Sequence, residues 1–185
     1  MSTNALDPSA GQQRYYGKFR GLVTDNVDPK QMGRIIAQVS AVLGESVSSW
    51  CMPCVPAAGM QAGCLIVPPI GSQVWIEFEQ GDTNSPIWSG GFWGDGSDVP
   101  TLGTAPPAIP PGQNIVLQTT GQSVLVVSDA APTPTGGGIL LRAGGASIVV
   151  NATGIYIDNG HGASITLVGN TVAVNETALT VVGGG

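Results

Sequence analysis

The chain has 185 residues, of which 28 are Gly and 14 are Pro, and only 10% are charged. Its formal net charge of -6 argues against a nucleic-acid binder, because neutralising phosphates requires a basic patch. Such a length usually means one domain, but the composition shifts along the chain and favours two short modules. Helical periodicity is scarce, so the composition indicates an all-β chain of short strands and turns.

The first residues, 1–14, are polar and are expected to form a flexible arm. They lack the positively charged region and following apolar stretch of a secretory signal. Apolar runs such as 124–127 and 139–141 are far shorter than the roughly 20 residues of a membrane-spanning helix. The sequence therefore does not predict a helix that resides in a bilayer.

Residues 15–94 contain five strand-like segments and a possible sixth, separated by Gly and Pro. In the clearest segment Val74, Ile76 and Phe78 alternate with residues of another face, which is the period of a half-buried strand. Short strands at this density predict a small closed barrel, for which the five-stranded OB-fold is the common solution. The segments are 15–23, 34–39, 50–56, 63–68, 74–79 and 87–93.

Residues 95–111 are rich in Pro and Gly and are expected to link two modules. Repeated prolines favour an extended, semi-rigid spacer without a core of its own. The second module is then expected over residues 112–185.

The second module contains a repeat of apolar pairs, each with one residue between its members. Each pair is interpreted as one short strand that points two side chains inward, with Gly, Asn, Thr and Asp at the corners. The pairs are Ile115/Leu117, Val124/Val126, Ile139/Leu141, Ile148/Val150, Ile155/Ile157, Ile165/Leu167, Val172/Val174 and Leu179/Val181.

Two inward residues per strand are too few to close a core within one chain, so copies of the chain must share it. Three chains around one axis would bury the pairs in a triangular β-prism and protect their strand edges. Eight crossings at roughly 4.8 Å would make a needle about 4 nm long. The candidate core residues of the trimer are Ile148, Val150, Ile155, Ile157, Ile165, Leu167, Val172, Val174, Leu179 and Val181.

The first module resembles the phage baseplate assembly protein V family, the central spike proteins of contractile tails. The resemblance covers nearly the whole module, in order. The matching stretches are Arg20 to Asn26, Asp28-Pro29, Gly33 to Ile35, Trp50 with Pro53-Cys54, Ala58-Gly59, Pro68 to Gly71, Val74 to Asp82 and Pro86 to Gly90.

This resemblance implies an OB-fold collar, three copies of which lie under the hub protein of the tail tube, followed by an intertwined trimeric β-helix. The basic residues cluster near the start of the chain, which suggests that they dock to the hub. These hub-docking candidates are Arg14, Lys18, Arg20, Lys30 and Arg34.

Some members of the family end in a tip that holds an iron ion through a His-x-His motif, which this sequence lacks. The family's alternative is a blunt needle capped by a separate tip protein of the proline-alanine-alanine-arginine repeat type. The final glycines, Gly183, Gly184 and Gly185, would allow close backbone approach at such an end, and a disordered tail is the other interpretation.

Candidate catalytic and metal-binding residues are few, and neither an enzyme nor a cofactor is predicted. Cys51, Cys54 and Cys64 could supply three zinc ligands, but no fourth is near, and buried cysteines often serve as small apolar residues. His161 lies in a Gly-rich corner, and three copies of it could bind a metal only on a trimer axis. Glu77 and Glu79 share a strand face, without the cleft that sugar hydrolysis needs.

The function predicted from these features is a structural spike of a tail baseplate that docks under the hub and pierces the target cell envelope when the sheath contracts. Its place is the virion, after assembly in the host cytoplasm, or the baseplate of a tailocin or another injection particle. The alternative is a trimeric β-prism that binds a cell-surface receptor or glycan, as tail fibres do.

Overall fold

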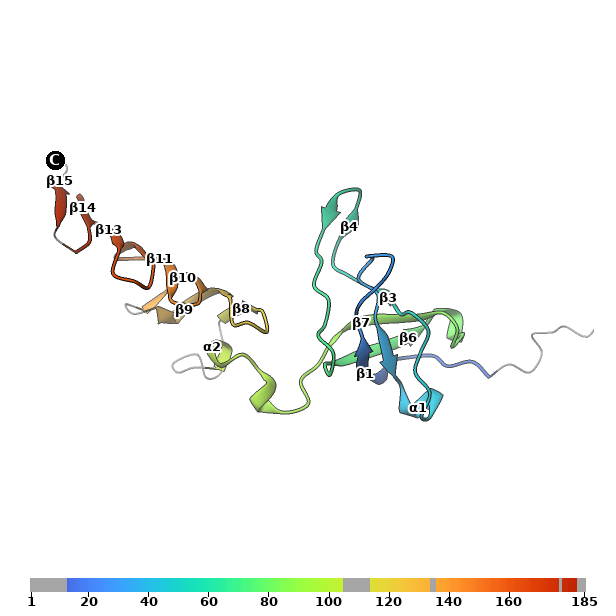
Figure 1. Cartoon of the computed structure of the whole chain (residues 1–185). Coiled ribbons are helices and arrows are strands. Elements are labelled where there is room, and N and C mark those ends of the chain that lie inside the picture. The colour runs from blue at the N-terminus through green and yellow to red at the C-terminus, as the bar shows by residue number, and fades with distance from the viewer. Residues whose placement is uncertain (1–12, 105–113, 134–135, 177, 183–185) are drawn as a thin grey trace, which may run out of the picture. The chain divides into compact units, whose positions relative to one another are not determined.

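The structure, a computed structural model, describes residues 13–104, 114–133, 136–176 and 178–182. The chain divides into two compact units, residues 1–94 and 95–185. Strands dominate both units, and the described helices are single short turns (Figure 1). Among the described residues, no helix has the length and apolar content needed to cross a bilayer.

The first unit is built on a sheet that closes on itself. Its strands are β1 (Phe19–Asp25), β2 (Ile36–Gln38), β3 (Met52–Pro53), β6 (Gln73–Phe78) and β7 (Pro86–Gly91), in the order β2-β1-β6-β7-β3. Two backbone hydrogen bonds join the outer edges of this sheet. The N–H of Ile35 donates to the carbonyl of Cys51 (3.3 Å), and the N–H of Cys51 donates back to Ile35 (2.7 Å). The five strands therefore form a small barrel.

The interior of the barrel follows the alternation that the sequence predicts for β6. Val74, Ile76 and Phe78 are buried, whereas the residues between them are half-buried. Gly21 of β1 crosses close to this strand, since a Cβ there would lie 2.8 Å from Cγ1 of Ile76. Trp88 of β7 completes the core and donates its ring N–H to the carbonyl of Gly33 (3.1 Å).

Smaller elements connect the barrel strands. They are α1 (Ser40–Leu43), β4 (Ala58–Gly59), β5 (Ala62–Gly63) and the 3-10 turn η1 (Glu79–Gly81). The expected strand over 63–68 is wrong: β4 and β5 form a two-stranded hairpin, and residues 64–68 that follow it have no regular structure. Two consecutive prolines end this segment, and proline has no N–H to donate to a sheet.

The second unit is one antiparallel sheet in which every strand pairs with its neighbours in sequence. At about 4.8 Å per strand, the eight strands stack over about 34 Å. The strands are β8 (Asn114–Gln118), β9 (Val124–Thr133), β10 (Gly136–Ala143), β11 (Ala146–Asn151), β12 (Gly154–Asp158), β13 (Ser164–Val168), β14 (Thr171–Val174) and β15 (Leu179–Val182).

The described part of the expected spacer is not extended. Residues 95–104 hold the 3-10 turn η2 (Gly96–Asp98) and the single helical turn α2 (Thr101–Thr104). Asp95 caps η2, because its carboxylate accepts the N–H of Ser97 at 2.9 Å. The amide of Asn114 donates to the carbonyl of Leu102 (3.0 Å), which fastens α2 to the start of the sheet.

Candidate functional site

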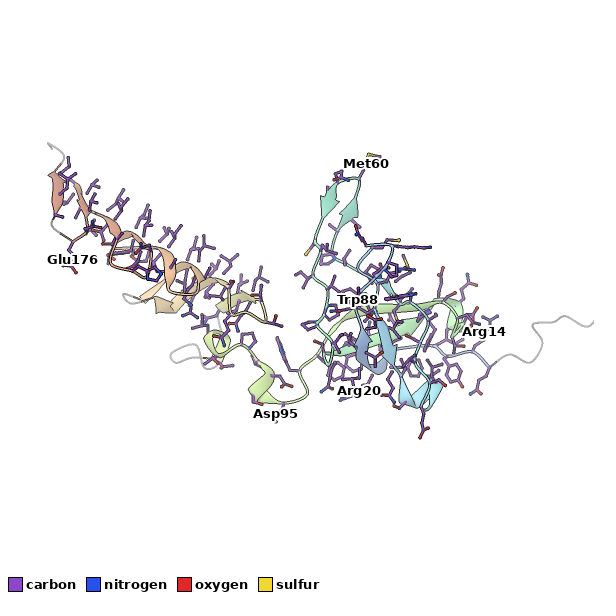
Figure 2. The ribbon with its side chains drawn as sticks, in the orientation of Figure 1. Arg14, Arg20, Met60, Trp88, Asp95 and Glu176 are labelled. Atoms are coloured by element: carbon purple, nitrogen blue, oxygen red, sulfur yellow. The ribbon has the colours of Figure 1, made fainter. Side chains whose placement is uncertain are left out.

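One face of the eight-stranded sheet carries two columns of aliphatic side chains, with one residue of each column on every strand (Figure 2). The pairing aligns them, since Ile148 lies opposite Ile157 and Ile157 lies opposite Ile165. The first column is Leu117, Leu125, Leu141, Ile148, Ile157, Ile165, Val174 and Leu179. The second column is Ile115, Val127, Ile139, Val150, Ile155, Leu167, Val172 and Val181.

The two columns are open to solvent in a single chain. The exposed side chains range from 38% for Val150 to 65% for Ile115. A groove of about 890 Å³ runs along the first column and is lined by Leu141, Ile148 and Ile165 among others. A continuous apolar face of this extent is rare on a monomer and marks a surface that another chain covers. All ten residues predicted for a trimer core lie on this face.

The reverse face of the sheet is different. Along the first strands it holds a small core in which Val126, Leu140 and Val149 are buried and Leu102 of α2 packs against them. Further along, that face carries polar side chains such as Asp158, which pairs across the sheet with Ser147 and Ser164 of the neighbouring strands. The open apolar face is therefore the face available to a partner.

The sequence interpretation of β9 is wrong by one residue. It assigned Val124 and Val126 to the repeated pairs, but the structure places Leu125 and Val127 in the columns and buries Val124 and Val126 on the reverse face. All four residues are apolar, so alternation within the strand cannot decide which set faces which way. The register with Leu117 of β8 decides it.

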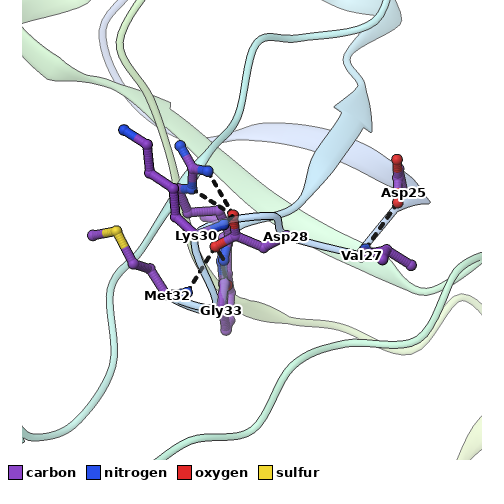
Figure 3. Close-up of polar contacts among 8 residues, drawn as sticks. Asp25, Val27, Asp28, Lys30, Met32 and Gly33 are labelled. Carbon is purple, nitrogen blue, oxygen red and sulfur yellow. Dashed lines mark hydrogen bonds and ion pairs between the residues drawn. The ribbon is translucent and has the colours of Figure 1, made fainter.

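A carboxylate network holds the loop between β1 and β2 (Figure 3). The carboxylate of Asp28 accepts backbone N–H groups of Lys30 (2.9 Å) and Met32 (2.8 Å). The guanidinium of Arg34 donates to the same carboxylate at 3.0 and 2.5 Å. Hydrogen bonds from Arg34, followed by those from the backbone, hold the pKa of Asp28 well below its usual range. The Asp28 and Arg34 side chains are only 4% and 12% exposed.

Two of the predicted hub-docking residues lie on the outer face of the barrel. Lys18 forms an ion pair with Glu77 (3.0 Å). Arg20 lies opposite Trp75, and its guanidinium is 5.6 Å from the Trp75 ring centroid and 4.9 Å from that of Phe92. Arginine stacked on aromatic rings is a common anchor of protein interfaces.

The other three predicted docking residues differ from one another. Arg34 is held by the buried network and by the ring of Trp50, 5.2 Å away, so its side chain is structural. Arg14 donates weakly to the carbonyl of Gln80 (3.4 Å), and Lys30 is exposed. The exposed basic side chains are therefore those outside the Asp28 network.

Comparison with known families matches both units. Residues 19–93 match the model of the type VI secretion system/phage-baseplate injector OB domain. Residues 114–180 match the model of the phage baseplate V C-terminal trimerisation domain. The chain belongs to the phage baseplate V family. No curated protein matches the chain.

The phage baseplate V matches confirm the fold class, which is all-β with an OB-fold followed by a trimeric β-domain. They also support a structural role in a tail baseplate and a homotrimer. All residues of the open apolar columns except Val181 lie within the matched trimerisation domain. The open apolar columns thus give a physical reason for the trimerisation that the family match indicates.

The residues weighed for metal chemistry stay apart in the described part of the chain, which holds no group of three or more metal-binding side chains. Cys51 is buried in the barrel closure, where burial raises the pKa of its thiol, and Cys54 is exposed. His161 lies in the exposed turn before β13, where its backbone N–H donates to the side chain of Asn159 (2.8 Å). Gly183, Gly184 and Gly185 lie outside the described residues.

Proposed function

We propose that three copies of this chain form the central spike of a contractile baseplate, with the OB units as a collar and the eight-stranded sheets as a needle. The observation that carries the proposal is the pair of unbroken aliphatic columns on a face that the chain itself leaves open. Three such faces turned toward one axis would bury both columns and share one apolar core.

The columns are long enough to drive this assembly. A large aliphatic side chain contributes about 1.5–3 kcal/mol when it is fully buried. Fourteen of the sixteen column side chains are 38% to 65% exposed, and Leu125 and Val174 are half-buried. Burying the exposed part of both columns is therefore on the order of 10 kcal/mol per chain. This is comparable with the roughly 4–15 kcal/mol that association costs in lost freedom. A trimer that also gains packing contacts would be stable.

The sheet suits a part that transmits force. Most consecutive strands are joined by turns of a few residues, so the antiparallel hydrogen-bond ladder is nearly continuous. Unfolding a ladder locked into a shared core requires many contacts to break together, which makes it slow. In the proposed mechanism sheath contraction drives this needle through the target envelope, without any chemical step.

Docking of the collar to a hub protein would use the exposed basic side chains. Lys18, Arg20, Lys30 and Arg14 present positive charge on the barrel, whereas Arg34 is held by Asp28. The stacked pair of Arg20 and Trp75 is the best anchor among them, because its geometry is already fixed. A separate tip protein at the far end of the needle stays a proposal drawn from the family.

The deciding experiment is the mass of the native protein by light scattering, repeated in denaturing detergent without boiling. A mass of three times 18.7 kDa that survives the detergent is expected for a needle with a shared core. A monomer, or a trimer that the detergent dissociates at once, would contradict the spike. Glycan binding by the purified trimer, without hub binding, would favour the tail-fibre function instead.

A further inference from the structure

The first unit exposes an apolar surface that the barrel does not use. The β4–β5 hairpin projects from the barrel, and Met60 at its tip is 97% exposed (Figures 1 and 2). Leu65 and Ile66, which follow the hairpin, are 72% and 61% exposed. On the neighbouring β1–β2 loop, Val27 is 75% exposed.

Two contacts hold the two loops together. The amide of Asn26 donates to the carbonyl of Pro68 (3.1 Å). Gly33 lies against the second loop, since a Cβ on it would be 3.0 Å from Cδ1 of Leu65. The Asp28 network fixes the β1–β2 loop from within. We call the set Val27, Met32, Met60, Leu65 and Ile66 the loop surface.

Three of the five residues of the loop surface, Met60, Leu65 and Ile66, lie in a stretch without charge. Between Glu45 and Glu77 the sequence contains no Asp, Glu, Lys or Arg, although the chain carries a net charge of -6. The exposed part of this stretch, residues 56–66 apart from the half-buried Cys64, would ordinarily hold charged residues. Depletion of charge with exposed Met and aliphatic side chains is typical of the centre of a protein interface.

We propose that the loop surface of each chain packs against the barrel of a neighbouring copy in the same trimer. This inference depends on the trimer of the proposed function. A copy is the occupant favoured by charge, because an uncharged surface can meet an identical chain of net negative charge without bringing like charges together. Interfaces between identical chains are also more apolar than those with transient partners.

The chain length keeps the neighbouring barrels within reach. β7 ends at Gly91, and α2, which begins at Thr101, is fastened to the sheet of the second unit. The intervening residues 92–100 span at most about 30 Å. Each barrel is thus tethered near the shared needle, at an effective concentration in the millimolar range. At that concentration even a weak contact forms.

Three-fold symmetry determines what the loop surface meets. Contacts around a three-fold axis are heterologous, so a patch on one chain touches a different patch on the next. The hairpin tip is therefore expected to meet a neighbour's barrel outside that neighbour's own hairpin.

The test uses the full-length trimer with Met60 replaced by the photocrosslinker p-benzoylphenylalanine. Ultraviolet light should then produce covalent dimers and trimers, with the crosslink mapped by mass spectrometry to a peptide outside residues 54–67. The same replacement at Tyr16, 72% exposed on the same unit, is the matched control and should give no such product. A second variant adds Leu65→Lys and Ile66→Lys to the crosslinker at Met60, and it should lose the product while remaining trimeric by light scattering.

The outcomes separate this inference from the proposed function. A trimer that forms no crosslink from position 60 would overturn the inference and leave the proposed spike function intact. A crosslink that forms only to an added hub protein would do the same. A chain that is monomeric before irradiation would instead overturn the proposed function. If the variant with Leu65→Lys and Ile66→Lys still forms the full amount of crosslinked product, the loop surface does not form the contact.

Discussion

At the scale of single residues, Asp28 is expected to stabilise the collar in a pH-dependent way. Donors from Arg34 and from the backbone lower the pKa of Asp28 in the folded chain. A carboxyl whose pKa is lower in the folded than in the unfolded state stabilises the fold at pH values above its ordinary pKa of about 4. This stabilisation is lost as the pH falls from that value through the pKa of the folded state. Asp28→Asn should therefore lower the melting temperature at pH 7. Below pH 4 the melting temperature of this variant should fall less steeply with pH than that of the unchanged protein.

Thermal unfolding followed by circular dichroism between pH 7 and pH 3 measures this effect. Asp25→Asn is the matched control, because Asp25 lies at the start of the same loop and accepts the single N–H of Val27 at 2.8 Å. Equal melting temperatures for the two variants at pH 7 would show that the network around Arg34 contributes nothing to stability.

A second single-residue prediction concerns the close strand approach at Gly154. A Cβ at this position would overlap the backbone carbonyl of Leu167 on β13. At Gly145 the nearest atom to an added Cβ is 3.4 Å away, in ordinary contact. Gly154→Ala is expected to destabilise the sheet by about 1–3 kcal/mol, and Gly145→Ala much less. Denaturant unfolding of both variants measures the difference, and similar midpoints would contradict the tight strand contact.

At the scale of the strand, substitutions at two adjacent residues of β13 are expected to have opposite effects on trimer assembly, because the residues lie on opposite faces of the sheet. Ile165 belongs to the open apolar column, whereas Thr166 faces the reverse side. Ile165→Lys would place three charges in the shared core of a trimer, where an unpaired charge costs several kcal/mol. The trimer is expected to dissociate or fail to assemble. Thr166→Lys should leave the mass by light scattering unchanged, and equal behaviour of the two variants would refute the assigned face.

The sequence predicts strands well where one alternating set is apolar and the other contains a charged residue. In β6 and β12 the inward or column residues alternate with sets that contain Glu77 and Asp158, and the structure agrees. In β9 both sets are apolar, so the pairing with β8 was needed to place Leu125 and Val127. The hairpin after Pro56 was missed because its strands are two residues long.

The sequence likewise predicted some features of the candidate site residues and missed others. A period of two predicted that the ten candidate core residues share one face, and the strand pairing shows that they do, because residues two apart in a strand point to the same side. Their place in a trimer core stays a prediction. The basic residues were grouped by their closeness in sequence, which says nothing of their partners. Arg34 is held by Asp28 only through the geometry of the β1–β2 loop, whose hydrogen bonds the sequence does not show. The uncharged stretch between Glu45 and Glu77 was a visible signal of the loop surface.

At the scale of the whole molecule, the two units bury apolar surface by different means. The barrel closes its own core, with Val23, Ile35 and Ile76 at most 1% exposed. The second unit leaves its columns open, and its core must be completed by other chains. Folding and assembly are therefore separable in the first unit and coupled in the second.

This difference predicts what each unit does when the chain is divided after Gly94. A fragment of residues 13–94 should fold as a monomer, with Trp88 shielded from solvent, because its core needs no partner. A fragment of residues 95–185 should be trimeric when folded and unfolded when monomeric. The contact proposed for the loop surface should be lost in the first fragment, since without the needle the barrels lack their high local concentration. Analytical ultracentrifugation measures the mass of both fragments. Tryptophan fluorescence follows the folding of the first fragment, and circular dichroism follows that of the second, which contains no Trp. A trimeric barrel fragment, or a folded monomeric sheet, would mean that trimerisation does not arise from the columns.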